Sequence, residues 1–131
     1  MRKQFTRLFT VFACFFLSLD PLFAAYSISI VNPAPNSTVV SGSNIDVSGS
    51  IGWDPMTESA PTGAFVTLFN SKGNVYSSSS ATVQSGGGSV GYDTNNQLAV
   101  PNAASQPFTI KSEGKVNGNT VISVTDNYTT S

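Results

Sequence analysis

The chain of 131 residues contains no histidine, and its single cysteine is Cys14 near the N-terminus. From residue 26 onward there is therefore neither an imidazole nor a thiol. This absence excludes Ser–His–Asp and Cys–His nucleophilic centres, the usual zinc sites and general-base catalysis by histidine. It also excludes a disulfide in that region. We therefore predict a protein that is not an enzyme and carries no cofactor.

Positive charge is scarce as well. Arg2, Lys3 and Arg7 lie at the N-terminus, and from residue 26 onward three lysines stand against six carboxylates, a net charge of −3. Binding of nucleic acid through its phosphates requires a basic patch, which this composition does not supply. The same argument removes attraction to an anionic membrane surface. We predict that the partner is not a nucleic acid.

Residues 1–25 have the pattern of a secretory signal peptide. The basic start MRKQFTR precedes the apolar run LFTVFACFFLSL, and LFAAY follows. The run is shorter than the roughly 20 residues that a membrane span needs. We predict cleavage after Ala24 or Ala25 and no membrane span in the mature chain. An alternative is a lipoprotein signal cut at Cys14, although the apolar run continues past this residue.

The predicted mature chain, residues 26–131, has the size of one domain, roughly 105 residues. Small extracellular domains of eukaryotes commonly depend on disulfides, because their cores are marginal. An exported chain without cysteine fits a bacterial protein better. The predicted location is the periplasm or the exterior of a bacterium.

Short runs of period-two alternation, separated by Gly, Pro, Asn and Ser, predict an all-β fold. YSISIV (26–31) and NIDVSGSI (44–51) alternate apolar and polar residues, whereas AFVTLFN (64–70) is apolar enough for burial on both faces. VYSSSSATV (75–83) is typical of a polar edge strand. The segment 84–97 is predicted to be a loop with a short strand near Tyr92. The pattern predicts a single antiparallel β-sandwich of about seven to eight strands.

Two stretches carry a resemblance to a known class. NPAPNSTVVSGSNIDVSGSI and QPFTIKSEGKVNGNTVISV resemble the first strands and the last hairpin of bacterial immunoglobulin-like or fibronectin-III-like domains. Cys–Trp–Cys spacing is absent, which excludes an antibody-type domain. The resemblance implies a spacer, an adhesive module or an accessory binding domain of a surface or secreted protein. It implies no catalytic residues.

The loop GWDPMTESAPTG (52–63) is the predicted binding surface, because it is long for a strand connection and holds the only tryptophan. Trp53, with Tyr92 nearby, would stack on a sugar ring through its apolar face. In the alternative interpretation Trp53 belongs to the core, since alternation places it on the same side as Ile51.

The same loop also raises the question of carboxylate chemistry. Asp54 and Glu58 are four residues apart, a spacing that would suit a sugar-cleaving pair or, as the simpler interpretation, a solvated turn. A loop calcium site formed with Asp93, Asn95 and Asn96 is a further alternative. No segment has the dense spacing of a dedicated metal loop, so we predict no metal site.

The sequence thus predicts an exported, non-catalytic binding or structural module of the bacterial envelope or exterior, with a protein or glycan partner. One alternative is a carbohydrate- or surface-binding adhesive module that uses Trp53 and the loop after it. Another is an assembly subunit that exchanges strands, for which the runs 26–31 and 75–80 offer the edges. 

Overall fold

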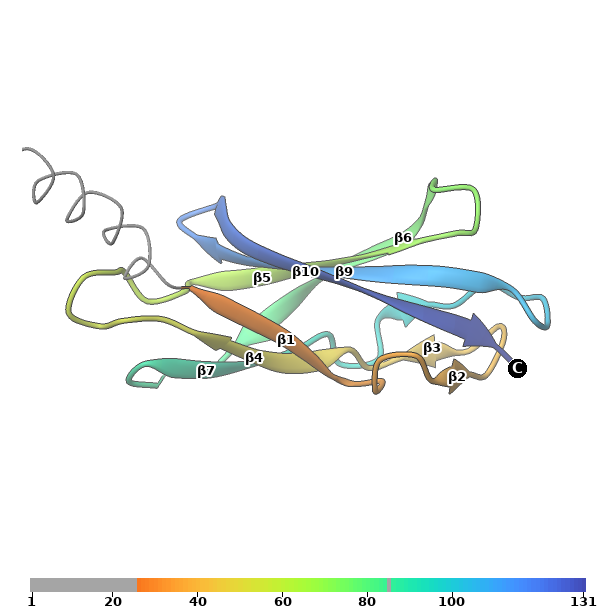
Figure 1. Cartoon of the computed structure of the whole chain (residues 1–131), viewed down its shortest axis with the longest axis horizontal. Helices are drawn as coiled ribbons and strands as arrows, with labels where there is room; N and C mark the ends of the chain where they lie inside the picture. The colour runs from red at the N-terminus through yellow and green to blue at the C-terminus, as the bar shows by residue number, and fades with distance from the viewer. Residues whose placement is uncertain (1–25, 85) are drawn as a thin grey trace, which may run out of the picture.

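The computed structural model describes residues 26–84 and 86–131. The predicted signal peptide and Cys14 lie outside these residues. Regular structure in the described part of the chain consists of strands (Figure 1). These are β1 (Ser27–Asn32), β2 (Thr38–Val39), β3 (Asn44–Ile45), β4 (Ser48–Gly52), β5 (Gly63–Phe69), β6 (Val75–Val83), β7 (Ser89–Asp93), β8 (Leu98–Ala99), β9 (Pro107–Val116) and β10 (Asn119–Thr130). No helix in the described ranges is long and apolar enough to cross a membrane.

The strands form two layers joined by β6. The order of the large sheet is β1-β4-β7-β6-β5-β9-β10-β2, and its pairs are antiparallel except β10 with β2. β6 pairs with β5 as far as Ala81 and then with β7 at Thr82 and Val83, so it passes from one layer to the other. Figure 1 shows β1, β4 and β7 below β5, β9 and β10. The predicted all-β fold is confirmed, and the arrangement is that of a β-sandwich.

The core fills the space between the two layers. Alternate residues of each strand point into it, as period-two sequences require. The buried apolar side chains are Ile30, Val39, Val47, Ile51, Trp53, Ala64, Val66, Leu68, Ala81, Val90, Tyr92, Leu98, Val100, Phe108, Ile110 and Tyr128. Each large aliphatic member contributes about 1.5–3 kcal/mol through burial.

The region from residue 44 to residue 52 is two strands rather than the single strand predicted. β3 pairs with β8, whereas β4 pairs with β1 and β7. Between them Val47 is fully buried, and its N–H donates to the Thr94 hydroxyl over 2.9 Å. The Thr94 N–H in turn donates to the Val47 carbonyl over 3.0 Å. A buried threonine therefore satisfies the backbone where the chain changes sheets.

The segment predicted as a loop with a short strand contains a central strand. β7 lies between β4 and β6 in the sheet, and Val90 and Tyr92 point into the core. The strand has only two large apolar side chains among polar and glycine residues, so its sequence pattern is weak. A weak sequence pattern therefore corresponds here to a strand inside the sheet, between β4 and β6.

A hairpin turn joins β5 to β6 at residues 70–74. Gly73 has a positive φ of 81°, which such turns require. The Asn70 side-chain oxygen accepts from the backbone N–H groups of Lys72 and Asn74, each over 3.0 Å. The turn is therefore held by its own side chain, and it fixes the ends of β5 and β6.

Candidate functional site

Trp53 lies in the core. Its side chain is 8% exposed and belongs to the buried cluster, while its backbone N–H donates to the Gly88 carbonyl over 3.0 Å. A ring with so little exposed area offers no open face for stacking. Of the two alternatives, the structure supports the core role, and contact of Trp53 with a ligand stays an untested prediction.

Tyr92 is also a core residue. It is 2% exposed, and its hydroxyl donates to the Ser29 carbonyl over 2.8 Å. Its cross-strand partner is Gly49, where an added Cβ would lie 2.8 Å from the tyrosine hydroxyl oxygen. The ring therefore occupies the space above a glycine. Burial raises the pKa of Tyr92 to about 12, so the hydroxyl remains a donor at neutral pH.

Asp54 and Glu58 hold the turn that opens the long loop. A Glu58 side-chain oxygen accepts from the Asp54 N–H over 2.8 Å, and an Asp54 oxygen accepts from the Met56 N–H over 3.0 Å. The Tyr26 hydroxyl donates to the Ser59 carbonyl over 2.7 Å. This arrangement resembles a capping box, in which side chains satisfy backbone donors. Both carboxylates have a structural task here, and a role in ligand contact stays a prediction.

Asp93 lies at the other end of β4 from Asp54. It pairs with Ser48 at the start of β4, so about four strand residues, roughly 13 Å, separate it from the strand's end. Its neighbour is Asp46, and the Asn95 N–H donates to both carboxylates, over 3.1 Å to Asp46 and 2.7 Å to Asp93. The residues of the alternative calcium site are therefore divided between the two ends of β4, with Asp93 and Asn95 at one end and Asp54 and Glu58 after the other.

The carboxyl groups of the two aspartates influence each other's titration. The hydrogen bond with Asp93, and then partial burial, raises the pKa of Asp46 above its ordinary value. The same hydrogen bond, followed by that from Asn95, lowers the pKa of Asp93. Within residues 26–84 and 86–131, no group of three or more His, Cys, Asp or Glu side chains is placed to hold a metal ion.

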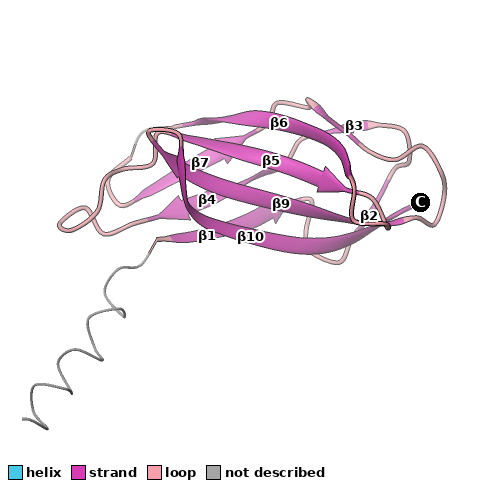
Figure 2. Ribbon diagram, turned by 90° about the horizontal axis from the view of Figure 1, so that it is seen from above, coloured by secondary structure: helices cyan, strands magenta, loops and turns pink. Residues whose placement is uncertain are grey.

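A surface that the sequence analysis missed lies on the solvent side of β5, β6, β9 and β10, which run side by side in Figure 2. Cross-strand partners point to the same side of a sheet, so the register identifies this outer face. Its residues are Phe65, Thr67, Phe69, Val75, Tyr76, Ser78, Ser80, Thr109, Lys111, Glu113, Lys115, Ser123, Thr125 and Asn127.

The aromatic part of the outer face lies on β5 and β6. Ala64, Val66 and Leu68 of β5 are buried in the core, whereas Phe65 and Phe69 are partly exposed. The predicted burial on both faces is therefore confirmed for Thr67, which is 7% exposed on the outer side, but not for the two phenylalanines. At a bulge opposite Phe69, Val75 is 61% and Tyr76 44% exposed. No signal in the sequence indicated that the phenylalanine rings would be partly exposed.

Charged side chains lie beside these aromatic rings. The Thr120 hydroxyl donates to a Glu113 oxygen over 2.8 Å and accepts from the Lys115 amine over 3.2 Å. The Lys115 amine is also 5.9 Å from the centre of the Phe65 ring, within cation–π range. Lys111 pairs with Thr67, between the two phenylalanines of β5. Within the described chain, the Lys111 amine has no hydrogen-bond or ion-pair partner.

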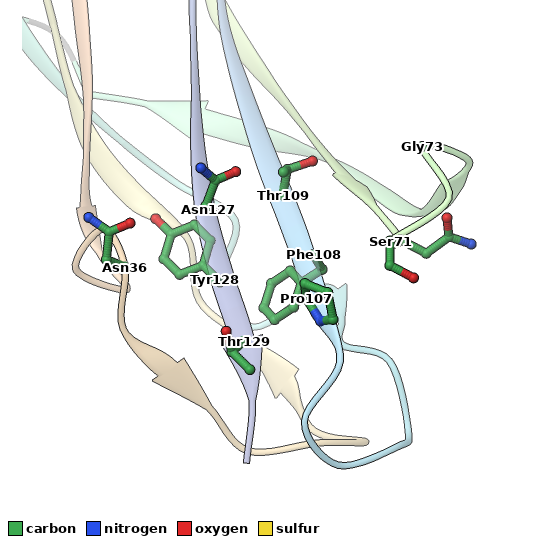
Figure 3. Close-up of a pocket in the computed structure, with 10 residues that line it drawn as sticks. Asn36, Ser71, Gly73, Pro107, Phe108, Thr109, Asn127, Tyr128 and Thr129 are labelled. Carbon is green, nitrogen blue, oxygen red and sulfur yellow. The ribbon is translucent and has the colours of Figure 1, made fainter.

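A shallow groove of about 440 Å³ lies at one end of the outer face. Figure 3 shows the Asn36, Thr109 and Asn127 side chains around it, with Pro107 at its base near the hairpin 70–74. The Asn36 N–H donates to the Asn127 carbonyl over 2.9 Å, which fixes the turn against β10. The groove is therefore lined by amide and hydroxyl groups, which can donate and accept, together with Pro107, Phe108 and Tyr128.

Comparisons with known proteins assign no family to the chain. No family model matches it, and no curated protein matches it. Among solved structures, CopC from Methylosinus trichosporium OB3b is similar with 13% identity and a TM-score of 0.44, covering 79% of this chain and 93% of that chain. So distant a likeness carries no argument about function, which is therefore inferred from the residues of this chain.

Proposed function

We propose that this protein is an exported, non-catalytic binding module of the bacterial envelope or exterior, and that it binds through the outer face. The observation that carries the proposal is the outward display of Phe65, Phe69 and Tyr76 on paired strands. Aromatic side chains supply much of the energy of binding surfaces, because they bury large apolar areas. A rigid sheet holds them in place with little loss of conformational entropy.

The composition and N-terminus support the remaining parts of the proposal. The basic and apolar pattern of residues 1–25 supports export, and the lack of cysteine after residue 25 supports a bacterial origin. The aromatic patch lies beside a groove with several hydrogen-bonding groups, a combination typical of ligand sites. The outer face thus takes the role that the sequence assigned to Trp53 and its loop.

The test is binding of the mature protein, purified after export, to intact bacterial envelopes and to isolated envelope polysaccharides. Phe69→Ala combined with Tyr76→Ser is expected to weaken binding at least tenfold while the circular dichroism spectrum stays unchanged. Met56→Ala is the matched control, since Met56 is 90% exposed but lies in the distant loop. Unchanged binding in the double variant would refute the outer face as the binding surface.

A second candidate function, strand-mediated assembly, is favoured by the free edge of β10. Over most of its length β10 pairs with β9 alone, and β2 joins it only at Thr129 and Thr130. An open edge presents backbone groups to a further strand. The Asn127 carbonyl and the Thr129 N–H face this edge, because they bond residues 36 and 37.

By alternation, the Thr125 N–H faces the same edge. Thr125→Pro would remove this donor without breaking the ladder to β9. If the mature protein assembles through β10, it elutes as oligomers in size-exclusion chromatography at high concentration, and the proline variant elutes as a monomer. A wild-type protein that stays monomeric at all concentrations rules this candidate out.

A further inference from the structure

We propose that the ligand of the outer face is an acidic polysaccharide that lies along β9, with its rings on the aromatic side chains and its carboxylates on Lys111 and Lys115. This inference rests on the proposed function and adds the chemical class of the ligand. It is carried by the side chains that surround the aromatic rings and by the distribution of charge over the molecule.

The neighbours of the aromatic rings favour a glycan over a protein. Apart from Val75, the remaining uncharged side chains of the outer face are serines, threonines and one asparagine. Protein interfaces are depleted in serine and lysine, and their centres are apolar. Hydroxyl and amide groups both donate and accept hydrogen bonds, which matches the hydroxyl groups of a sugar. The aromatic rings supply apolar faces for the C–H side of a sugar ring.

The distribution of charge favours an acidic glycan over a neutral one. Lys111 and Lys115 point to the outer face from one strand, four residues or roughly 13 Å apart. Between them Glu113 is engaged by the Thr120 hydroxyl. Asp126 of β10 pairs with the fully buried Ile110 and so points to the core side of the sheet. Two lysines therefore stand on this face against a single, engaged carboxylate.

The remaining carboxylates of the described chain lie elsewhere. Asp46 and Asp93 form their pair at one end of β4, and Asp54 and Glu58 hold the loop after its other end. The outer face is therefore locally positive, although the protein as a whole is acidic. Because the Lys111 amine has no hydrogen-bond or ion-pair partner among the described residues, a ligand carboxylate would bind it without displacing an existing ion pair there.

The length of the face suits a polymer. From Lys115 to Pro107, β9 spans eight residue steps, roughly 27 Å. The groove between Asn36, Thr109 and Asn127 lies at the Pro107 end. An extended chain would thus pass the two amines and the phenylalanines before its last unit enters the groove. Rigid aromatic rings at several points along such a path give affinity that a single sugar would not reach.

The experiment compares two polymers with the same backbone and different charge. Binding of the mature protein to polygalacturonate and to its methyl ester is measured by affinity electrophoresis and calorimetry, with alginate as a second acidic probe. We expect at least tenfold tighter binding of polygalacturonate than of its ester. The preference should shrink at 0.5 M salt, because salt screens exposed charges. Lys111→Gln with Lys115→Gln should remove the preference, and Lys111→Arg with Lys115→Arg should keep it.

The outcomes separate the ligand class from the proposed function. Equal binding of the acid and ester forms, lost on Phe69→Ala with Tyr76→Ser, overturns the acidic ligand and leaves the binding module in place. Capture of a protein through the same aromatic residues, without binding of either acidic polymer, also overturns the inference. A wild-type protein that binds no polymer and no envelope component contradicts the proposed function itself.

Discussion

Two aromatic regions of this molecule differ in the direction of their side chains. Trp53 and Tyr92 lie in the layer of β4 and β7 and point into the core, whereas Phe65 and Phe69 of β5 belong to the outer face. Tryptophan is the residue most often associated with sugar stacking, yet here it stabilises the fold. The comparison teaches that the side of the strand on which a residue falls, and not its chemical type, decides whether it meets a ligand.

The largest expected difference is in the free energy of unfolding when one aromatic residue of each region is replaced by alanine. Trp53→Ala should lower the free energy of unfolding by about 3–5 kcal/mol, because it removes a buried ring and leaves a cavity. Phe69→Ala should cost no more than about 1 kcal/mol, since its side chain is only partly buried and packs on one side of the sheet. Urea denaturation followed by circular dichroism measures both values. Similar losses of unfolding free energy in the two variants would contradict the assignment of Trp53 to the core and of Phe69 to the outer face.

Two glycines extend the comparison to the backbone. Gly49→Ala places a Cβ in steric conflict with the Ser29 carbonyl oxygen and against Tyr92, so strand β1 must shift. We expect a loss of about 1–3 kcal/mol in unfolding free energy, the range for overpacked positions. Gly63→Ala is the control, because no atom lies within 4 Å of its added Cβ. The same urea titration reports both, and an unaffected Gly49 variant would contradict the close packing at Tyr92.

Removal of the Tyr92 hydroxyl tests its hydrogen bond to the Ser29 carbonyl. Tyr92→Phe should cost about 0.5–1.5 kcal/mol, because the Ser29 carbonyl loses its buried donor. Tyr76→Phe, at an exposed position, should leave stability unchanged.

The pH dependence gives a second measurement on Tyr92. Its pKa of about 12 in the folded protein exceeds the ordinary value of 10.0, so the unfolded chain releases this proton first. Stability should therefore be complete below pH 10 and decline as the pH rises toward 12. Tyr92→Phe should reduce that decline in thermal unfolding measured from pH 9 to 11.5. The pKa of Tyr128 is raised as well, by burial, so part of the decline should remain.

The smallest expected change in stability comes from substitutions in the two carboxylate pairs, Asp46 with Asp93 and Asp54 with Glu58. Asp46→Asn keeps an acceptor for the Asn95 N–H and removes the titrating carboxyl group beside Asp93. Since the pKa of Asp46 is raised in the folded protein, its protonated form stabilises at low pH, and that contribution is lost as the pH rises past this pKa. We expect Asp46→Asn to be more stable than wild type at pH 7 by at most about 0.5 kcal/mol, because the pair is only partly buried and solvent screens its repulsion.

The control for this change is a carboxylate that bonds to backbone rather than to a second acid. Glu58→Gln keeps an oxygen for the Asp54 N–H and should leave stability at pH 7 unchanged. Thermal unfolding between pH 3 and 7 measures both variants. An identical pH profile for Asp46→Asn and wild type would show that the pKa of Asp46 is not raised by its contact with Asp93.

Much of the fold was predictable because strand formation depends on local patterns. The alternating or apolar runs around Ile28, Val66 and Ile110 predicted strands at each of these positions, and strands occur there. The break between Ile45 and Ser48 was not predictable, because alternation continues through it while the pairing partners change. The pairing depends on residues that are distant in sequence, such as Thr94.

The candidate site was less predictable than the fold. Composition alone determined the absence of histidine and thiol chemistry after residue 25, and the alternation determined an all-β domain. Only the tertiary structure decided that Trp53 lies in the core and that Phe65 and Phe69 share a face with Lys111. The physical reason is that a strand's own sequence defines its two faces, whereas the neighbouring strands and layers determine which of those faces is covered.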